Sequence, residues 1–169
     1  RIANWIALYD FFGASGDETF KSIFFASLYK QIKLLKRVYF FHPSPDARLK
    51  AIKGLFFAGA FEKLSPLELE EGLSDLKLAL QGIFNRDGGH HSGNPYLQFL
   101  AIRDLIDVRS ILKTTAEIEP GFLTEAIQKT TPVLRLFRTG DGGLSNFKGS
   151  ATPEQLGFCP EEIPPSLID

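Results

Sequence analysis

A chain of 169 residues is long enough for one domain, and a hydrophobic content of 44% excludes an intrinsically disordered segment. The formal net charge of −1 gives no overall attraction to nucleic acid, and no apolar run reaches the roughly 18 residues of a membrane span. We therefore expect no nucleic-acid partner and no membrane span. The single cysteine, Cys159, excludes an internal disulfide.

Apolar residues recur at helical spacing along most of the chain. The pattern predicts about six main helices, over residues 2–12, 18–41, 46–62, 66–83, 95–112 and 120–138. Asp17, Ser65 and Asn94 are expected N-caps, the last two followed by proline at the first helical position. Pro132 is expected to kink or split the last helix. No stretch alternates with period two, so the sequence predicts an all-α protein.

Two of the predicted helices have distinctive apolar faces. In the 18–41 helix the stripe places Phe20, Ile23, Phe24 and Leu28 inward. The 46–62 helix is apolar or small on nearly every side, which indicates burial on more than one side.

Residues 86–96 interrupt the helical periodicity with a polar, glycine-rich loop. The loop contains two of the three histidines, an Asp-Gly-Gly turn, an amide and Tyr96. Because a polar loop between rigid helices is a common place for functional side chains, we take this loop as the candidate site.

The Asp-Gly-Gly core of this loop recurs 54 residues later, at Asp141-Gly142-Gly143. Each copy follows a helix that ends in apolar, aromatic and basic residues. A period of this size holds one helical hairpin, so the chain is expected to consist of stacked antiparallel hairpins with like loops at one rim.

Each candidate residue of the first loop has a functional and a structural interpretation. His90 is either a base or substrate ligand, or a histidine that holds the turn through a hydrogen bond. His91 is its neighbour and is expected to point elsewhere. Tyr96 is either a proton donor or a packed aromatic residue, and Asn94 is first of all an N-cap.

The aspartates of the two turns, Asp87 and Asp141, are expected to accept hydrogen bonds from their own turns. Their use as a glycosidase carboxylate pair is an alternative. His42, His90 and His91 lack the spacing of a metal site, so no metal and no cofactor are expected.

Four motifs in order resemble the helical domain of the bacterial heparinase II/III-like polysaccharide lyases, over nearly all of residues 1–148. They are Arg1-Ile2-Ala3-Asn4-Trp5-Ile6, Leu55-Phe56-Phe57-Ala58-Gly59, Asp87-Gly88-Gly89-His90 with Asn94-Pro95, and Asp141-Gly142-Gly143-Leu144-Ser145-Asn146-Phe147. The resemblance implies a partial (α/α) toroid over residues 1–150. It also implies that the Pro-rich tail or linker of residues 151–169 leads to a C-terminal β-sandwich domain absent from this sequence.

The resemblance further implies β-elimination on a uronic-acid-containing polysaccharide such as a heparin- or heparan-like glycan. The implied catalytic residues are His90 and Tyr96, and the implied substrate-binding residues are Asn94, His91, Arg48 and Asp87.

The chain departs from the family at several positions. Asp46 and Ala47 stand where the family often has Asn-His, and an acid there is expected to repel a uronate carboxylate. Gly93 replaces a common arginine, and Leu97 stands where a family tyrosine falls, one residue after Tyr96.

These departures leave a second hypothesis, a non-catalytic glycan-binding or structural α/α module. The expected partners are an acidic polysaccharide and the absent β-sandwich domain. That domain, or self-association, is expected to cover apolar surface on the end helices. The helical segment alone is expected to show little turnover. The compartment, bacterial periplasm or cytoplasm, is not fixed by the sequence.

Overall fold

The computed structural model describes residues 1–13, 15–41, 44–140 and 143–149. The all-α prediction is confirmed over these residues, which form seven α-helices, one 3-10 turn and no strand beyond isolated bridges. The elements are α1 (Ile2–Ala7), α2 (Tyr9–Phe12), α3 (Glu18–Val38), η1 (Tyr39–Phe41), α4 (Pro45–Phe61), α5 (Pro66–Ile83), α6 (Pro95–Thr115) and α7 (Gly121–Leu136). The tail of residues 151–169 lies outside the described residues.

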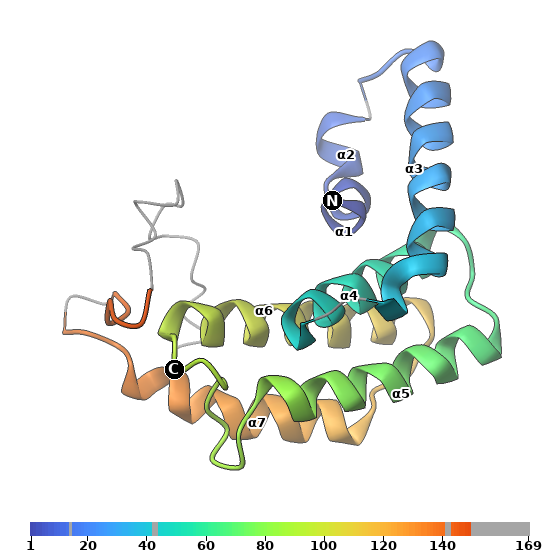
Figure 1. The fold of residues 1–169 in the computed structure, drawn as a ribbon. Helices are drawn as coiled ribbons and strands as arrows, with labels where there is room; N and C mark the ends of the chain where they lie inside the picture. Colours follow the sequence, from blue (N-terminus) through green and yellow to red (C-terminus); the bar gives the residue numbers. More distant parts are fainter. Residues whose placement is uncertain (14, 42–43, 141–142, 150–169) are drawn as a thin grey trace.

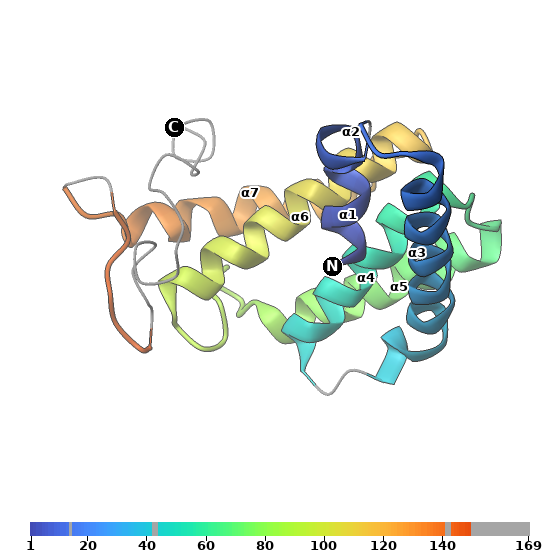
Figure 2. The same ribbon diagram turned by 90° about the horizontal axis from the view of Figure 1, so that it is seen from above.

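Helices α4 to α7 form two antiparallel hairpins that stack side by side. α4 packs against α5 and α6, and α6 packs against α7. Figures 1 and 2 show α4 and α6 running in the same direction in one layer, with α5 and α7 in the layer beneath. This is the arrangement that the 54-residue period predicts.

The main hydrophobic core lies between the two hairpins. Three helices each contribute one or two completely buried side chains to it: Leu76 and Ile83 from α5, Leu105 from α6 and Leu123 from α7. α4 contributes to this core and also packs against α1 and α3, so its nearly all-round apolarity has the predicted cause.

The predicted helix starts are confirmed in detail. Asp17 Oδ1 accepts a 2.7 Å hydrogen bond from Phe20 N. Ser65 and Glu68 form a reciprocal capping box before α5. Asn94 Oδ1 accepts hydrogen bonds from the backbone N–H groups of residues 96 and 97 at the start of α6. Each cap satisfies backbone donors that the first helical turn leaves without partners.

Three helix boundaries differ from the prediction. The 2–12 helix is broken at Leu8, which lets Tyr9 and Phe12 both turn toward the Phe24 ring, at centroid distances of 5.3 and 5.5 Å. The 18–41 helix ends as α-helix at Val38 and tightens into η1. Pro132 does not split α7, because the one lost intrahelical hydrogen bond is outweighed by packing on both sides of the proline.

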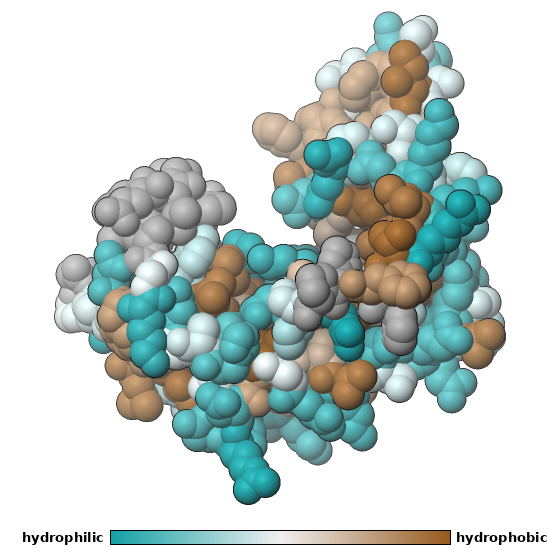
Figure 3. Space-filling model, in the orientation of Figure 1, coloured by the Kyte–Doolittle hydropathy of each residue, from teal (hydrophilic) through white to brown (hydrophobic). Residues whose placement is uncertain are grey.

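Helices α1, α2 and α3 rise from the α4 surface and leave apolar side chains exposed (Figures 1 and 3). Phe24 and Leu28 are buried as predicted, but Phe20 is 41% and Ile23 66% exposed. The inward placement of these two residues was therefore wrong, because the short α1–α2 segment covers only part of α3. Exposed apolar side chains on these helices agree with the expected uncovered surface, and its covering partner stays a prediction.

A buried ion pair joins the first helices of the two hairpins. Lys53 Nζ on α4 lies 2.7 Å from Asp104 Oδ1 on α6 and also contacts Asp107. The side chains of Lys53 and Asp104 are 12% and 6% exposed, so each charge depends on the other for compensation. None of the described helices is both long and apolar enough to cross a membrane.

Candidate functional site

The two Asp-Gly-Gly loops have the same backbone hydrogen bonds, displaced by 54 residues. Asn85 N donates to Gly89 O at 2.8 Å, and Thr139 N donates to Gly143 O at 3.0 Å. The next pair of the ladder, His91 N to Ile83 O, matches Ser145 N to Phe137 O, both at 2.8 Å. Over the described residues the sequence repeat is therefore matched in the backbone, because the same small antiparallel ladder follows the second helix of each hairpin.

The first loop leads into the start of α6, and the second loop follows the end of α7, at the same end of this helix pair (Figure 1). Asn94 Nδ2, on the first loop, donates a 3.0 Å hydrogen bond to Lys148 O, beyond the second turn. The segment after the second turn therefore contacts the first loop, and the expectation that the two turns share one rim stays a prediction.

Gln98 fixes the first loop to the helices beneath it. Its side chain is completely buried; Oε1 accepts from His90 N at 2.5 Å, and Nε2 donates to Gly88 O and Thr130 O, each at 3.0 Å. Gly88 has φ +89°, and a Cβ there would lie 2.5 Å from the Lys129 carbonyl oxygen. The turn therefore requires glycine at this position.

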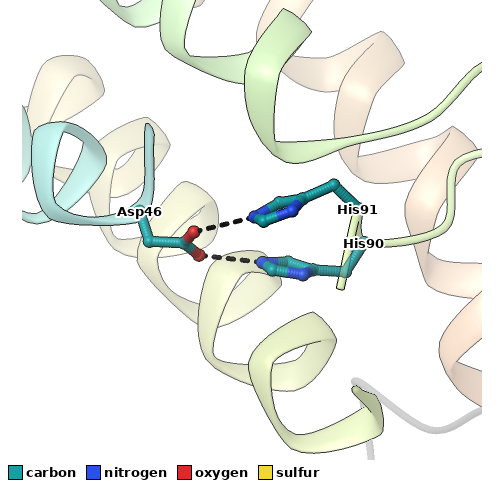
Figure 4. Close-up of side chains that lie close together, drawn as sticks. All are labelled: Asp46, His90 and His91. Atoms are coloured by element: carbon teal, nitrogen blue, oxygen red, sulfur yellow. Dashed lines mark hydrogen bonds and ion pairs between the residues drawn. The ribbon is translucent and has the colours of Figure 1, made fainter. Parts of the chain in front are cut away.

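An imidazole–carboxylate cluster forms where this loop meets the start of α4 (Figure 4). Asp46 Oδ1 lies 2.8 Å from His90 Nε2, and Asp46 Oδ2 lies 3.2 Å from His91 Nε2. The two rings lie side by side, with centroids 4.6 Å apart and a 30° tilt. One carboxylate thus contacts both histidines, although 44 residues separate Asp46 from His90. The expectation that His91 points elsewhere was wrong, because the shared carboxylate draws both rings to the same side.

The surrounding hydrogen bonds assign the tautomer of His90. Asn94 N donates to Ser92 Oγ at 3.1 Å, and Ser92 N donates to His90 Nδ1 at 3.2 Å. Because Nδ1 accepts, Ser92 Oγ, 2.8 Å away, donates its proton to Nδ1, and Nε2–H donates to Asp46. Both ring nitrogens of His90 are therefore occupied by hydrogen bonds.

The position of Asp46 explains its ionisation. Burial acts to raise the pKa of Asp46, but the hydrogen bonds from His90 and His91 outweigh it and lower the pKa below 3.8. The residue also lies in the first turn of α4, after the Ser44 N-cap, where the helix dipole favours negative charge.

The two histidines differ in access. The His90 side chain is fully buried, whereas that of His91 is 46% exposed. Nε2 of His91 faces the carboxylate, and its Nδ1 has no hydrogen-bond partner among the described residues. The cluster can therefore exchange a proton with a solvent-side ligand through His91 rather than through His90.

The other predicted site residues have clear structural surroundings. Asn94 is an N-cap that also holds the second loop, and Asp87 Oδ1 accepts a 2.8 Å hydrogen bond from Gly89 N in its own turn, as expected. Tyr96 is half-buried and packs with the cluster around Phe99. Arg48 is half-buried on the first turns of α4. Asp141 lies outside the described residues.

A cation lies beside this loop at a position the sequence did not indicate. Lys148 is exposed, and its side chain passes over Gly93, where a Cβ would lie 2.7 Å from Lys148 Nζ. Gly93 itself has φ +64°. Lys148 therefore places a positive charge next to the loop that carries His91.

Comparisons with protein-family models, curated proteins and solved structures return no match to this chain.

Two functional side chains escaped the sequence prediction. Asp46 was treated as an obstacle to a uronate, whereas it is the group that brings both histidines together. Gln98 is a polar residue on an otherwise apolar helix face, and this mismatch was an available signal. Together with His90 and His91, Asp46 offers donor atoms that all lie within 4.8 Å of one another, a set capable of holding a metal ion.

Proposed function

We propose that this chain is the substrate-binding helical segment of a polysaccharide lyase-like protein, within a partial (α/α) toroid. The reaction would be β-elimination on a uronic-acid-containing polysaccharide. The observation that carries the proposal is the exposed imidazole of His91, on the loop that follows α5. The partly buried carboxylate of Asp46, at the start of α4, orients this ring through its Nε2 atom. Parallel hairpins with matching backbone ladders, and the motif resemblance, support the architecture.

The proposed chemistry assigns the proton transfers to His91. Nδ1 takes the proton from the sugar carbon next to the carboxylate, and the released electron pair forms a carbon–carbon double bond. The glycosidic carbon–oxygen bond then breaks, and the His91 imidazolium returns the proton to the leaving oxygen. Asp46 holds Nε2–H throughout and stabilises the transient positive charge, as carboxylates do for catalytic histidines.

His90 is a positioning residue in this proposal. Its buried ring ties Asp46 to Ser92 and lies against the His91 ring, so it fixes both partners of the proton transfer. Tyr96, the other catalytic residue that the sequence indicated, is half-buried, and its role stays a prediction tested by Tyr96→Phe.

Lys148 is the proposed binding residue for the uronate carboxylate. The proton next to a carboxylate becomes acidic only when the charge that develops on the carboxylate is stabilised, and an exposed ammonium group beside the loop can do so.

The test incubates full-length protein with a panel of uronic-acid polysaccharides and follows the ultraviolet absorbance of the unsaturated product. We expect His91→Ala and Asp46→Asn to lose at least about 100-fold in kcat, and Lys148→Gln to act mainly on KM. Glu70→Gln, at an exposed site on α5, is the charge-matched control. Glycan binding without product on any substrate would refute the lyase and favour a non-catalytic glycan-binding module.

A further inference from the structure

We propose that Asp46, His90 and His91 also form a binding site for a divalent transition-metal ion of the Zn²⁺ class. The three side chains converge from the start of α4 and from the loop, with both Nε2 atoms directed at the carboxylate (Figure 4). The site goes beyond the proposed function and does not rest on it, because it requires no glycan.

The distances between the donor atoms suit such an ion. Zn²⁺ lies about 2.0–2.2 Å from an imidazole nitrogen or a carboxylate oxygen, so neighbouring donors in its shell lie roughly 3 Å apart. The two Asp46–histidine separations are 2.8 and 3.2 Å. An ion can therefore enter by a small displacement of the rings, without rearrangement of the backbone.

The chemistry of the donors selects the kind of ion. Two imidazole nitrogens and one carboxylate oxygen favour Zn²⁺, Co²⁺ or Ni²⁺ over Mg²⁺ and Ca²⁺, which prefer sites built wholly of oxygen. The Asp46 and His91 side chains are 27% and 46% exposed, so water can reach the remaining coordination position.

A second shell for the metal-bound form is already present. When Nε2 of His90 binds the ion, its proton moves to Nδ1, which gives up the 3.2 Å hydrogen bond from Ser92 N and instead donates to Ser92 Oγ, now 2.8 Å away. The proton of His91 likewise moves to Nδ1, which faces solvent. Both rings stay neutral, so no proton is lost and the ion reverses the negative charge of the cluster.

Metal binding and the proposed proton transfer exclude each other. With Nε2 of His91 on the ion and a proton on Nδ1, the ring has no lone pair for a sugar proton. The ion would therefore inhibit the proposed elimination. Zn²⁺ binding is measured on the protein without glycan, so this test can succeed even if no glycan is cleaved.

The test is isothermal titration of the 169-residue chain with Zn²⁺, and visible spectroscopy with Co²⁺ as a reporter of imidazole coordination. We expect one saturable site and no comparable binding of Mg²⁺. Asp46→Asn and His91→Ala are expected to weaken binding by more than about 100-fold, and Ser92→Ala by roughly 10- to 100-fold. Glu70→Gln is the control and is expected to bind as the unaltered chain does.

His91 is exposed, so His91→Ala tests the site without disturbing the core. Histidine ring ¹⁵N spectra give an independent readout, because His90 should change from the Nε2–H to the Nδ1–H tautomer on Zn²⁺ addition. Absence of saturable Zn²⁺ binding, or binding that is unchanged in both Asp46→Asn and His91→Ala, would overturn the proposal.

Discussion

Replacing Gln98 tests whether a single buried amide holds the candidate site in place. Gln98 lies on α6, beneath the loop, and its side chain makes three hydrogen bonds, all to backbone atoms. Two of the atoms belong to the loop, His90 N and Gly88 O, and the third is Thr130 O on α7. Gln98→Ala removes the side-chain partner of all three backbone atoms at once.

The magnitude follows from the groups that lose their partners. A buried backbone donor or acceptor left without a hydrogen bond costs about 1–3 kcal/mol. The two loop groups together therefore predict a loss of about 2–6 kcal/mol for Gln98→Ala, a large share of the 5–15 kcal/mol typical of a domain. Gln81→Ala, on the exposed face of α5, is the matched control and should change stability by less than about 0.5 kcal/mol.

Urea denaturation, followed by circular dichroism, measures the free energy of unfolding of each variant. Hydrogen exchange of the His90 amide gives the local effect and should lose its protection in Gln98→Ala. Gln98→Glu adds a second test, since its carboxylate would face two carbonyl oxygens and would have to be protonated in the folded state. That variant should be less stable at about pH 7 than at about pH 4. A loss below about 1 kcal/mol for Gln98→Ala, with His90 still protected, would refute the reasoning.

Three further predictions concern stability. Gly88→Ala should lower the free energy of unfolding by more than about 2 kcal/mol in urea denaturation, because the residue has a positive φ and its Cβ would clash with Lys129. Gly121→Ala is the control and should be neutral or slightly stabilising, because a Cβ there meets nothing within 4 Å. Asp104→Asn should cost about 1–3 kcal/mol in the same assay and more than Asp107→Asn, because Asp104 is the more buried carboxylate while Asp107 still compensates the charge of Lys53. The backbone hydrogen bond of the capping box, and then an ion pair with a lysine, lower the pKa of Glu68 from 4.5 to about 2. Its contribution is present above pH 4.5 and is lost as pH falls toward 2, so Glu68→Gln should flatten acid unfolding across that range.

The helices and the loops were predictable because their signals are local. Ser65 with Glu68, and Asn94 with Pro95, mark helix starts through contacts within four residues, and both are confirmed. The 54-residue repeat could also be recognised in the sequence, because turns of the same conformation need the same residue types. These signals report the conformation of a short segment and do not depend on what packs against it.

The partners across the molecule were not predictable in the same way. Helical periodicity states which face of a helix is buried and not which residue it meets. Asp46 and His90 are 44 residues apart, and Lys53 and Asp104 are 51 residues apart. The Lys53–Asp104 pair follows from stacking two parallel hairpins, whereas the Asp46–His90 pair follows from the return of the loop after α5 to the start of α4. Gln98 and Asp104, polar residues on the buried face of α6, were the visible indication that such partners exist.

The structural repeat also explains why one loop carries the candidate site and the other does not. At equivalent positions of the two turns stand His90 and Leu144, and each loop returns toward the start of its own hairpin. His90 meets Asp46, the second residue of α4, whereas Leu144 packs into the same cluster as Tyr96, the second residue of α6. The same backbone thus supports a polar contact in one hairpin and an apolar contact in the other. A double variant that places the second pair at the first loop, Asp46→Tyr with His90→Leu, should therefore preserve the turn and abolish Zn²⁺ binding at the proposed site.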